Sequence, residues 1–207
     1  MSTTQRYKTV LLFGAPGVGK GTQGKILGCI PGFFHLSTGD MFRALDKDSE
    51  MGRLFLSFST KGELVPDDVT VELWRRYTAE LVEKGAYSPE ADLLLLDGIP
   101  RSETQAELMD EHIDVLRIIH LDCDDMDEMV ARLRLRAERE KRADDTKEDV
   151  IRRRLSIYRA ETQPVLAHYA ADKRSAIDAL GTPAEVQRRI LDVLAPLQRD
   201  RFGNALD

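Results

Sequence analysis

The chain has 207 residues, of which 42% are hydrophobic and 32% charged, and a formal net charge of -6. This length suits one domain with a substantial core, and the negative charge disfavours wholesale binding to nucleic acid or to membranes. The two cysteines, Cys29 and Cys123, lack a C-x-x-C spacing, which argues against structural zinc and a disulfide scaffold. There is no signal-peptide pattern and no apolar run of membrane-spanning length, so we expect a soluble, cytoplasmic protein.

The first half of the sequence predicts alternating strands and helices. A β-branched and apolar run at residues 8–13 predicts a buried strand, and residues 19–28 predict the helix that follows it. For the long helix predicted at residues 67–84, either Asp67 or Asp68 is expected to cap the N-terminus. The other elements expected in this half are a short strand within residues 30–37 and helices over residues 40–45 and 50–59.

The second half continues the alternation. Continuous apolar runs at residues 92–98 and 115–122 are typical of central parallel strands that are buried on both faces. Strands that alternate with helices predict an α/β fold with a central parallel sheet flanked by helices. The polar tail after Pro196 is expected to fray. Helices are expected over residues 102–111, 126–139, 146–169 and 184–197.

The segment GAPGVGKGTQ, residues 14–23, follows the first predicted strand and opens the first predicted helix. A G-x-x-x-x-G-K pattern in that setting predicts a phosphate-binding loop, because backbone N–H groups and the helix N-terminus converge on one oxyanion. Lys20 is then placed to bridge the outer phosphates. Gly21 occupies the position where most such loops carry the Ser or Thr that coordinates Mg²⁺, and Thr22 comes one residue later.

This variant loop resembles the signature of adenylate kinases and related nucleoside-monophosphate kinases. The resemblance extends over residues 8–195 and implies a P-loop three-layer fold in one domain, residues 1–207. Within that domain it implies a helical AMP-binding segment at residues 37–66 and a short lid at residues 132–142. The other matching segments, in family order, are LSTGDMFR (36–43), GELVPDDVT (62–70), DGIPRSETQ (97–105) and the arginine-rich region around RADD (142–145).

The resemblance also implies an activity and a set of site residues. The implied reaction is reversible, Mg²⁺-dependent phosphoryl transfer from ATP to AMP by a monomer, with Asp97 holding the metal through water. Residues implied in catalysis are Lys20, Arg101, Arg136, Arg142 and Arg154. Residues implied in ATP binding are Gly17, Val18, Gly19, Lys20, Gly21, Thr22, Arg132, Arg136 and Gly181. Residues implied in AMP binding are Thr38, Arg43, Glu63, Leu64, Val65, Gly98, Arg101, Gln105, Arg142 and Arg154.

The lid is short. Seven residues separate Arg134 from Arg142, which leaves no room for the zinc-binding insertion of long-lid relatives, so no zinc is expected. Ala137 stands where short-lid relatives often have Gly.

Alternative interpretations remain at this stage. Thr38 and Gln105 favour AMP, since a Gln amide suits the N1 and amino edge of adenine, but both side chains are also compatible with an ordinary polar surface. UMP/CMP kinases and other nucleoside-monophosphate kinases share most of the pattern, and a nucleotide-binding regulator without activity would share the loop. The basic residues 132–154 are compatible with a solvated helix or with RNA binding, the former being favoured for Arg134, Arg139, Lys141, Arg152 and Arg153.

Overall fold

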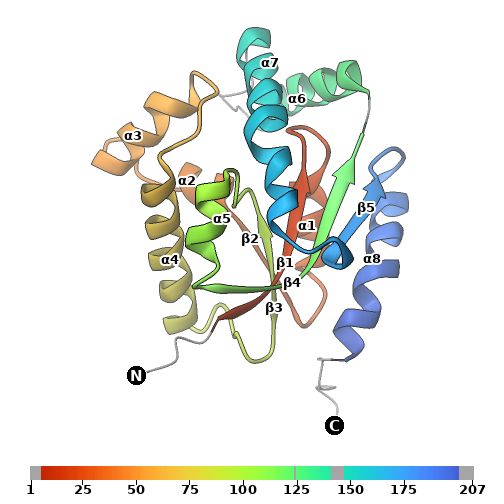
Figure 1. Cartoon of the computed structure of the whole chain (residues 1–207). Helices are drawn as coiled ribbons and strands as arrows, with labels where there is room; N and C mark the ends of the chain where they lie inside the picture. Colours follow the sequence, from red (N-terminus) through yellow and green to blue (C-terminus); the bar gives the residue numbers. More distant parts are fainter. Residues whose placement is uncertain (1–5, 124, 141–146, 201–207) are drawn as a thin grey trace.

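The computed structural model describes residues 6–123, 125–140 and 147–200. Within these residues the strands form one parallel sheet in the order β2-β3-β1-β4-β5, with helices on both faces (Figure 1). The α/β fold with a central parallel sheet is therefore confirmed. The strands are β1 (Tyr7–Gly14), β2 (Phe33–Ser37), β3 (Leu93–Asp97), β4 (Ile113–Asp122) and β5 (Arg174–Asp178).

A helix follows each strand along the chain, as parallel strands in one sheet require a crossover connection. None of the helices in the described part of the chain is long and apolar enough to cross a membrane. The helices are α1 (Lys20–Leu27), α2 (Thr38–Arg43), α3 (Glu50–Ser59), α4 (Asp67–Glu83), α5 (Glu103–Met109), α6 (Met126–Glu140), α7 (Glu148–Ile157) and α8 (Pro183–Arg199).

Alternate side chains of β1 enter two different hydrophobic cores. Leu11 belongs to a cluster with Trp74 of α4, on the face that α4 and α5 cover. Leu12 belongs to a second cluster with Ile190 of α8, on the face that α1 and α8 cover. Because successive strand residues point to opposite faces, both faces need apolar side chains, and this explains the uninterrupted apolar runs in the sequence.

The pairing register brings polar residues together at the carboxyl edge of the sheet. Leu12 of β1 pairs with Asp97 of β3, and Ser37 of β2 pairs with the same Asp97. The phosphate-binding loop, the start of α2 and the turn after β3 consequently leave the sheet side by side. In open parallel sheets this edge is where ligands bind.

The prediction of a single helix at residues 146–169 was wrong. The structure has α7 only to Ile157, followed by a π-helical stretch, Tyr158–Thr162, and a 3₁₀ stretch, Gln163–His168. Pro164 lies in the 3₁₀ stretch, and proline has no N–H to donate and clashes with the carbonyl of the preceding turn. The backbone therefore leaves the α-helical pattern as it approaches Pro164.

Three further expectations differ from the structure. The edge strand β5 was not predicted, because its short sequence RSAID contains a single fully apolar buried residue, Ile177. Helix α8 continues through Pro196 instead of fraying there, since Leu194 and Leu197 keep its apolar face on the core. Neither Asp67 nor Asp68 caps α4. Pro66 is the N-cap residue, and the cap has no side-chain hydrogen bond.

Candidate active site

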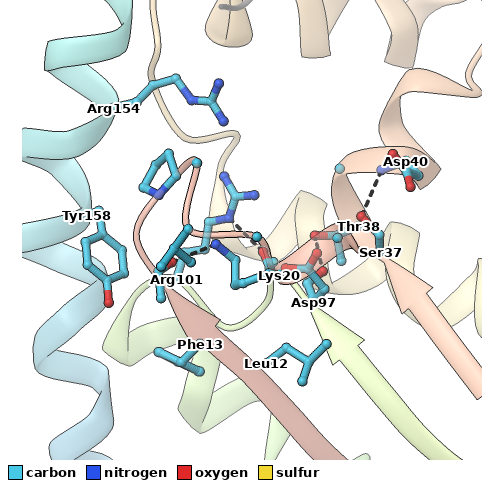
Figure 2. Close-up of a pocket in the computed structure, with 18 of the residues that line it drawn as sticks. Leu12, Phe13, Lys20, Ser37, Thr38, Asp40, Asp97, Arg101, Arg154 and Tyr158 are labelled. Atoms are coloured by element: carbon cyan, nitrogen blue, oxygen red, sulfur yellow. Dashed lines mark hydrogen bonds between the residues drawn. The ribbon is translucent and has the colours of Figure 1, made fainter. Parts of the chain in front are cut away.

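A cavity of about 810 Å³ lies over the carboxyl edge of the sheet. Its walls come from the phosphate-binding loop and α1, from α2, from residues 62–65, from the turn after β3, and from α6 and α7. Figure 2 shows Lys20 and Asp97 at its base, with Arg154 on the side of α7. The cavity therefore brings together segments that are far apart in the sequence.

The loop between β1 and α1 has the curled backbone that an anion site requires. Gly14 has φ of 143°, and a Cβ built on it would lie 2.5 Å from the carbonyl oxygen of Leu121. No other residue fits this conformation so close to β4. Lys20, the first residue of α1, folds back over the loop and donates from Nζ to the carbonyl oxygens of Gly14 at 2.7 Å and Ala15 at 3.1 Å. The ammonium group is thus held at the centre of the loop.

The pKa of Lys20 is lowered from 10.5 to about 8. Burial is the largest cause, because it penalises the charged ammonium form. Asp97 opposes this shift, whereas Arg101, Arg136 and Arg154 add to it. Three arginines that come from different segments thus act on one ammonium group, which marks this cavity as a site built for anions.

Asp97 ends β3 beside the loop and is 7% exposed. A Cβ placed on Gly21 would lie 3.8 Å from Asp97 Oδ2, so the position without a side chain is next to this carboxylate. A buried carboxylate that lines the cavity fits a metal ion that keeps its water ligands. Among the described residues no group of three or more His, Cys, Asp or Glu side chains is placed to hold a metal directly.

The turn after β3 and the start of α2 form the second half of the cavity. Thr38 Oγ1 donates to the carbonyl oxygen of Asp97 at 3.2 Å, and Arg101 Nε donates to that of Gly98 at 2.7 Å. Thr38 and Gln105 are each 2% exposed, so the alternative that they are ordinary surface residues was wrong. Both side chains line the cavity.

Arg43 and the segment 62–65 complete this half. Arg43 Nη2 donates to Asp40 Oδ1 at 2.6 Å, and this ion pair orients its guanidinium beside the cavity. Glu63, Leu64 and Val65 line the cavity as a group. Glu63 Oε1 also accepts from Arg153 Nη2 of α7 at 2.7 Å, and this ion pair links the segment to the opposite wall.

Helices α6 and α7 contribute the remaining arginines. Arg132, Arg136 and Arg154 line the cavity, as do the loop residues Gly17, Val18, Gly19, Gly21 and Thr22 and, on the far side, Gly181. Arg132 is oriented by Glu128, whose Oε1 accepts from its Nε at 2.8 Å. Arg142, and with it the end of the expected lid at residues 132–142, lies outside the described residues.

Some cavity residues were not expected from the sequence. Arg139 is exposed, as expected for a solvated helix surface, but it also lines the cavity, and so does Tyr158 from the π-helical stretch. By contrast Arg134 and Arg152 pair with Glu148, as expected for a charged helix surface. Arg139 follows Arg132 and Arg136 at helical spacing in α6, and this spacing could have predicted that it lines the cavity. Tyr158 begins the π-helical stretch, which was not predicted from the sequence.

Comparisons with known proteins agree with this geometry. The family model described as "Adenylate kinase" matches residues 12–174. The adenylate kinase of Kocuria rhizophila is 40% identical over 193 residues, which cover 89% of this chain and 97% of that protein. Those of Flavobacterium johnsoniae and Thermus thermophilus are 38% and 37% identical over 192 and 190 residues, covering 89% and 88% of this chain and 97% and 95% of those proteins. The chain belongs to the adenylate kinase family.

Proposed function

We propose that the chain catalyses reversible transfer of the γ-phosphoryl group of ATP to AMP, giving two ADP. The observation that carries this proposal is the single cavity in which Lys20 and the loop face Arg43 and Arg101. A protein that only senses one nucleotide needs no second set of phosphate-binding arginines. Two nucleotides whose phosphates meet in one cation-rich cavity are the requirement for direct phosphoryl transfer.

The proposed donor site is the half of the cavity around the loop. The N–H groups at the start of α1 and the Lys20 ammonium bind the β- and γ-phosphates. Arg132 and Gly181 both line the cavity and are proposed to contact the adenine of ATP. Burial holds Lys20 ready for this task, because a poorly solvated ammonium gains more from a phosphate than an exposed one does.

The proposed acceptor site is the other half, which corresponds to the expected AMP-binding segment at residues 37–66 and the turn after β3. Arg43 and Arg101 bind the AMP phosphate through their planar guanidinium groups. Arg136 and Arg154, which line the cavity and act electrostatically on Lys20, are proposed to bind the phosphoryl group in transit. Arg142, although outside the described residues, is proposed to join them.

The acceptor is its own nucleophile. A phosphate oxygen of AMP attacks the γ-phosphorus in line, so no protein side chain forms a covalent intermediate. The residues of the chain position the two nucleotides and neutralise the charge that gathers between them. Movement of the lid and of the AMP-binding segment over the cavity excludes water, which would otherwise accept the phosphoryl group.

ATP is proposed to bind as its Mg²⁺ complex. The buried Asp97 carboxylate, next to a residue 21 that has no side chain, fits a hydrated metal ion, and with no hydroxyl at residue 21 the phosphates become its chief direct ligands. When bound, the ion neutralises part of the charge on the β- and γ-phosphates. No zinc is proposed. We also propose that a monomer is sufficient for activity.

The test is an acceptor panel. Purified protein is mixed with ATP, Mg²⁺ and one of AMP, CMP, UMP or GMP, and formation of the diphosphates is followed. We expect product chiefly with AMP. Product chiefly with UMP or CMP would retain the phosphate sites and overturn the assignment of the base. ATP binding without product from any acceptor would favour a regulatory nucleotide-binding protein, and RNA retained on a filter at low salt would favour the RNA-binding alternative.

A further inference from the structure

Gln105 carries the amide that the resemblance to adenylate kinases implies for binding the adenine of AMP, and its surroundings determine which way that amide points. Gln105 lies in α5, whose N-cap Ser102 accepts from the Gln105 N–H at 3.0 Å. The side chain is 2% exposed and lines the cavity. At such a position the two ends of the amide cannot exchange partners freely with water, so the protein groups around it decide its orientation.

Two partners hold the amide from opposite ends. Gln105 Oε1 accepts from the backbone N–H of Arg101 at 2.8 Å. Gln105 Nε2 donates to Asp67 Oδ1 at 2.7 Å. A backbone N–H can only donate and a carboxylate can only accept, so the reversed amide would place two donors together at one end and two acceptors at the other. The orientation of Gln105 is therefore specified by chemistry.

Each partner uses only part of the hydrogen-bonding capacity of the amide. The nitrogen has a second hydrogen and the oxygen a second lone pair, so one donor and one acceptor remain for a ligand. Adenine presents an acceptor at N1 and a donor at its amino group, which is the complement of that pair. Hypoxanthine presents a donor at N1 and an acceptor at O6, so it matches only the reversed amide.

Asp67 is well placed to act through Gln105. It is the first residue of α4, and its carboxylate contacts Gln105 of α5 although the N-terminus of α4 has no side-chain cap. Asp67 is not among the residues that line the cavity, whereas Gln105 is.

We infer that Asp67 is a specificity-determining positioning residue, which selects adenine over hypoxanthine by holding the Gln105 amide in one orientation. This inference rests on the proposed function for the identity of the acceptor site. It adds a residue that neither contacts the base nor lines the cavity. It also explains why the acidic side chain at the start of α4 makes a hydrogen bond to another helix instead of capping its own.

The test compares AMP with IMP in the wild type and in Asp67→Asn. The asparagine amide can donate or accept, so the reversed orientation of Gln105 regains a partner at that end. We expect the preference for AMP over IMP, measured as the ratio of the two kcat/KM values, to fall about tenfold or more, with the change mainly in KM. The matched control is Asp68→Asn, which removes the same charge from the same helical turn at an exposed residue.

Equilibrium binding of AMP and IMP, measured by calorimetry without ATP, separates this inference from the proposed function. If Asp67→Asn loses the binding preference and the wild type transfers no phosphoryl group, the inference stands and the proposed function fails. If both aspartate variants keep the wild-type ratio, or both lose it equally with a matching loss of thermal stability, the positioning role of Asp67 is overturned. A wild type that binds AMP and IMP equally also overturns it.

Discussion

Lys20 has surroundings very different from those of an ordinary surface lysine. It is held inside the loop by two carbonyl oxygens and lies within the electrostatic reach of three arginines and one carboxylate. Burial and the arginines lower its pKa to about 8, so without nucleotide the Lys20 ammonium loses its proton at mildly alkaline pH. Binding of an anion must reverse that shift, which couples nucleotide binding to a proton.

This coupling predicts proton uptake when ATP binds at pH 8.5. Below pH 8 Lys20 is mostly protonated before ATP arrives, whereas above it the free protein has lost the proton that phosphate binding restores. ATP affinity should therefore fall as pH rises through about 8. Calorimetry at pH 8.5 in two buffers of different ionisation enthalpy measures the uptake. The variant Lys20→Met should show none, while Lys84→Met, at an exposed lysine of the helix C-terminus, should match the wild type.

The lowered pKa of Lys20 also affects the stability of the fold, which should rise with pH where ATP affinity falls. The folded-state pKa of Lys20 lies below its ordinary value of 10.5, so the unfolded chain binds more protons between about pH 8 and 10.5. Lys20 therefore lowers the free energy of unfolding below pH 8, and this cost diminishes as pH rises through that window. A residue that binds phosphate well in this position thus destabilises the empty protein.

At the scale of elements, the site depends on two strand-to-helix turns that approach closely. Gly98, after β3, has φ of 91°, and a Cβ on it would lie 2.6 Å from Thr38 Oγ1 at the start of α2. The same turn presents the Gly98 carbonyl oxygen to Arg101 Nε. The spacing of these turns therefore sets the positions of both Thr38 and Arg101 in the acceptor half of the cavity.

Gly98→Ala is expected to disturb this approach. The substitution combines backbone strain from positive φ, which costs on the order of 1 kcal/mol, with a clash against Thr38. The control is Gly85→Ala, where φ is 68° but nothing lies within 4 Å of the added Cβ. In urea unfolding, the free energy of unfolding should fall more for Gly98→Ala than for Gly85→Ala. The KM for AMP should rise only in Gly98→Ala. If both variants lost the same free energy of unfolding and kept the wild-type KM for AMP, the role of the close approach between Gly98 and Thr38 would be contradicted.

At the scale of the whole molecule, one cavity brings together parts of the chain that lie on opposite faces of the sheet. Val18 of the loop packs in the core that α1 and α8 cover. Thr38 and Gln105 lie in α2 and α5, whose apolar residues pack in the core on the other face of the sheet. The ion pair between Glu63 and Arg153 spans from the acceptor segment to α7. Nucleotides in the two halves are therefore expected to stabilise the fold through different contacts.

Thermal unfolding with separate nucleotides tests this division. A ligand at about a hundred times its Kd adds about 2.7 kcal/mol to the free energy of unfolding, and for a chain of this size each kcal/mol raises Tm by about 2–4 °C. Lys20→Met should lose the rise in Tm produced by ATP and keep that produced by AMP. Arg101→Ala should do the reverse. If either variant lost both responses equally, the cavity would not divide into a donor and an acceptor half as proposed.

Much of this architecture was predictable because it depends on neighbours close in the sequence. The apolar runs of β1 and β3 predicted the buried parallel sheet, and the GAPGVGKGTQ segment predicted a loop in which Lys20 is central. The short spacing within residues 97–105 keeps three predicted site residues close together: Asp97 at the end of β3, Arg101 in the turn that follows, and Gln105 in α5. The roles of these residues toward nucleotides stay predictions, which the experiments above address.

Local sequence determined the strands other than β5, the loop and the α/β alternation of this chain, since each follows from side-chain periodicity or backbone freedom over a few residues. Only the tertiary structure decided between competing partners. Asp67 could cap its own helix, but packing of α4 against α5 offered it Gln105, 38 residues away. Pro164 lies where the α-helical pattern has given way, whereas Pro196 is tolerated because Leu194 holds α8 on the core. For Asp67 and Pro196 the free energy of a distant contact outweighed a local preference that the sequence alone expresses, whereas at Pro164 the local preference of proline prevailed.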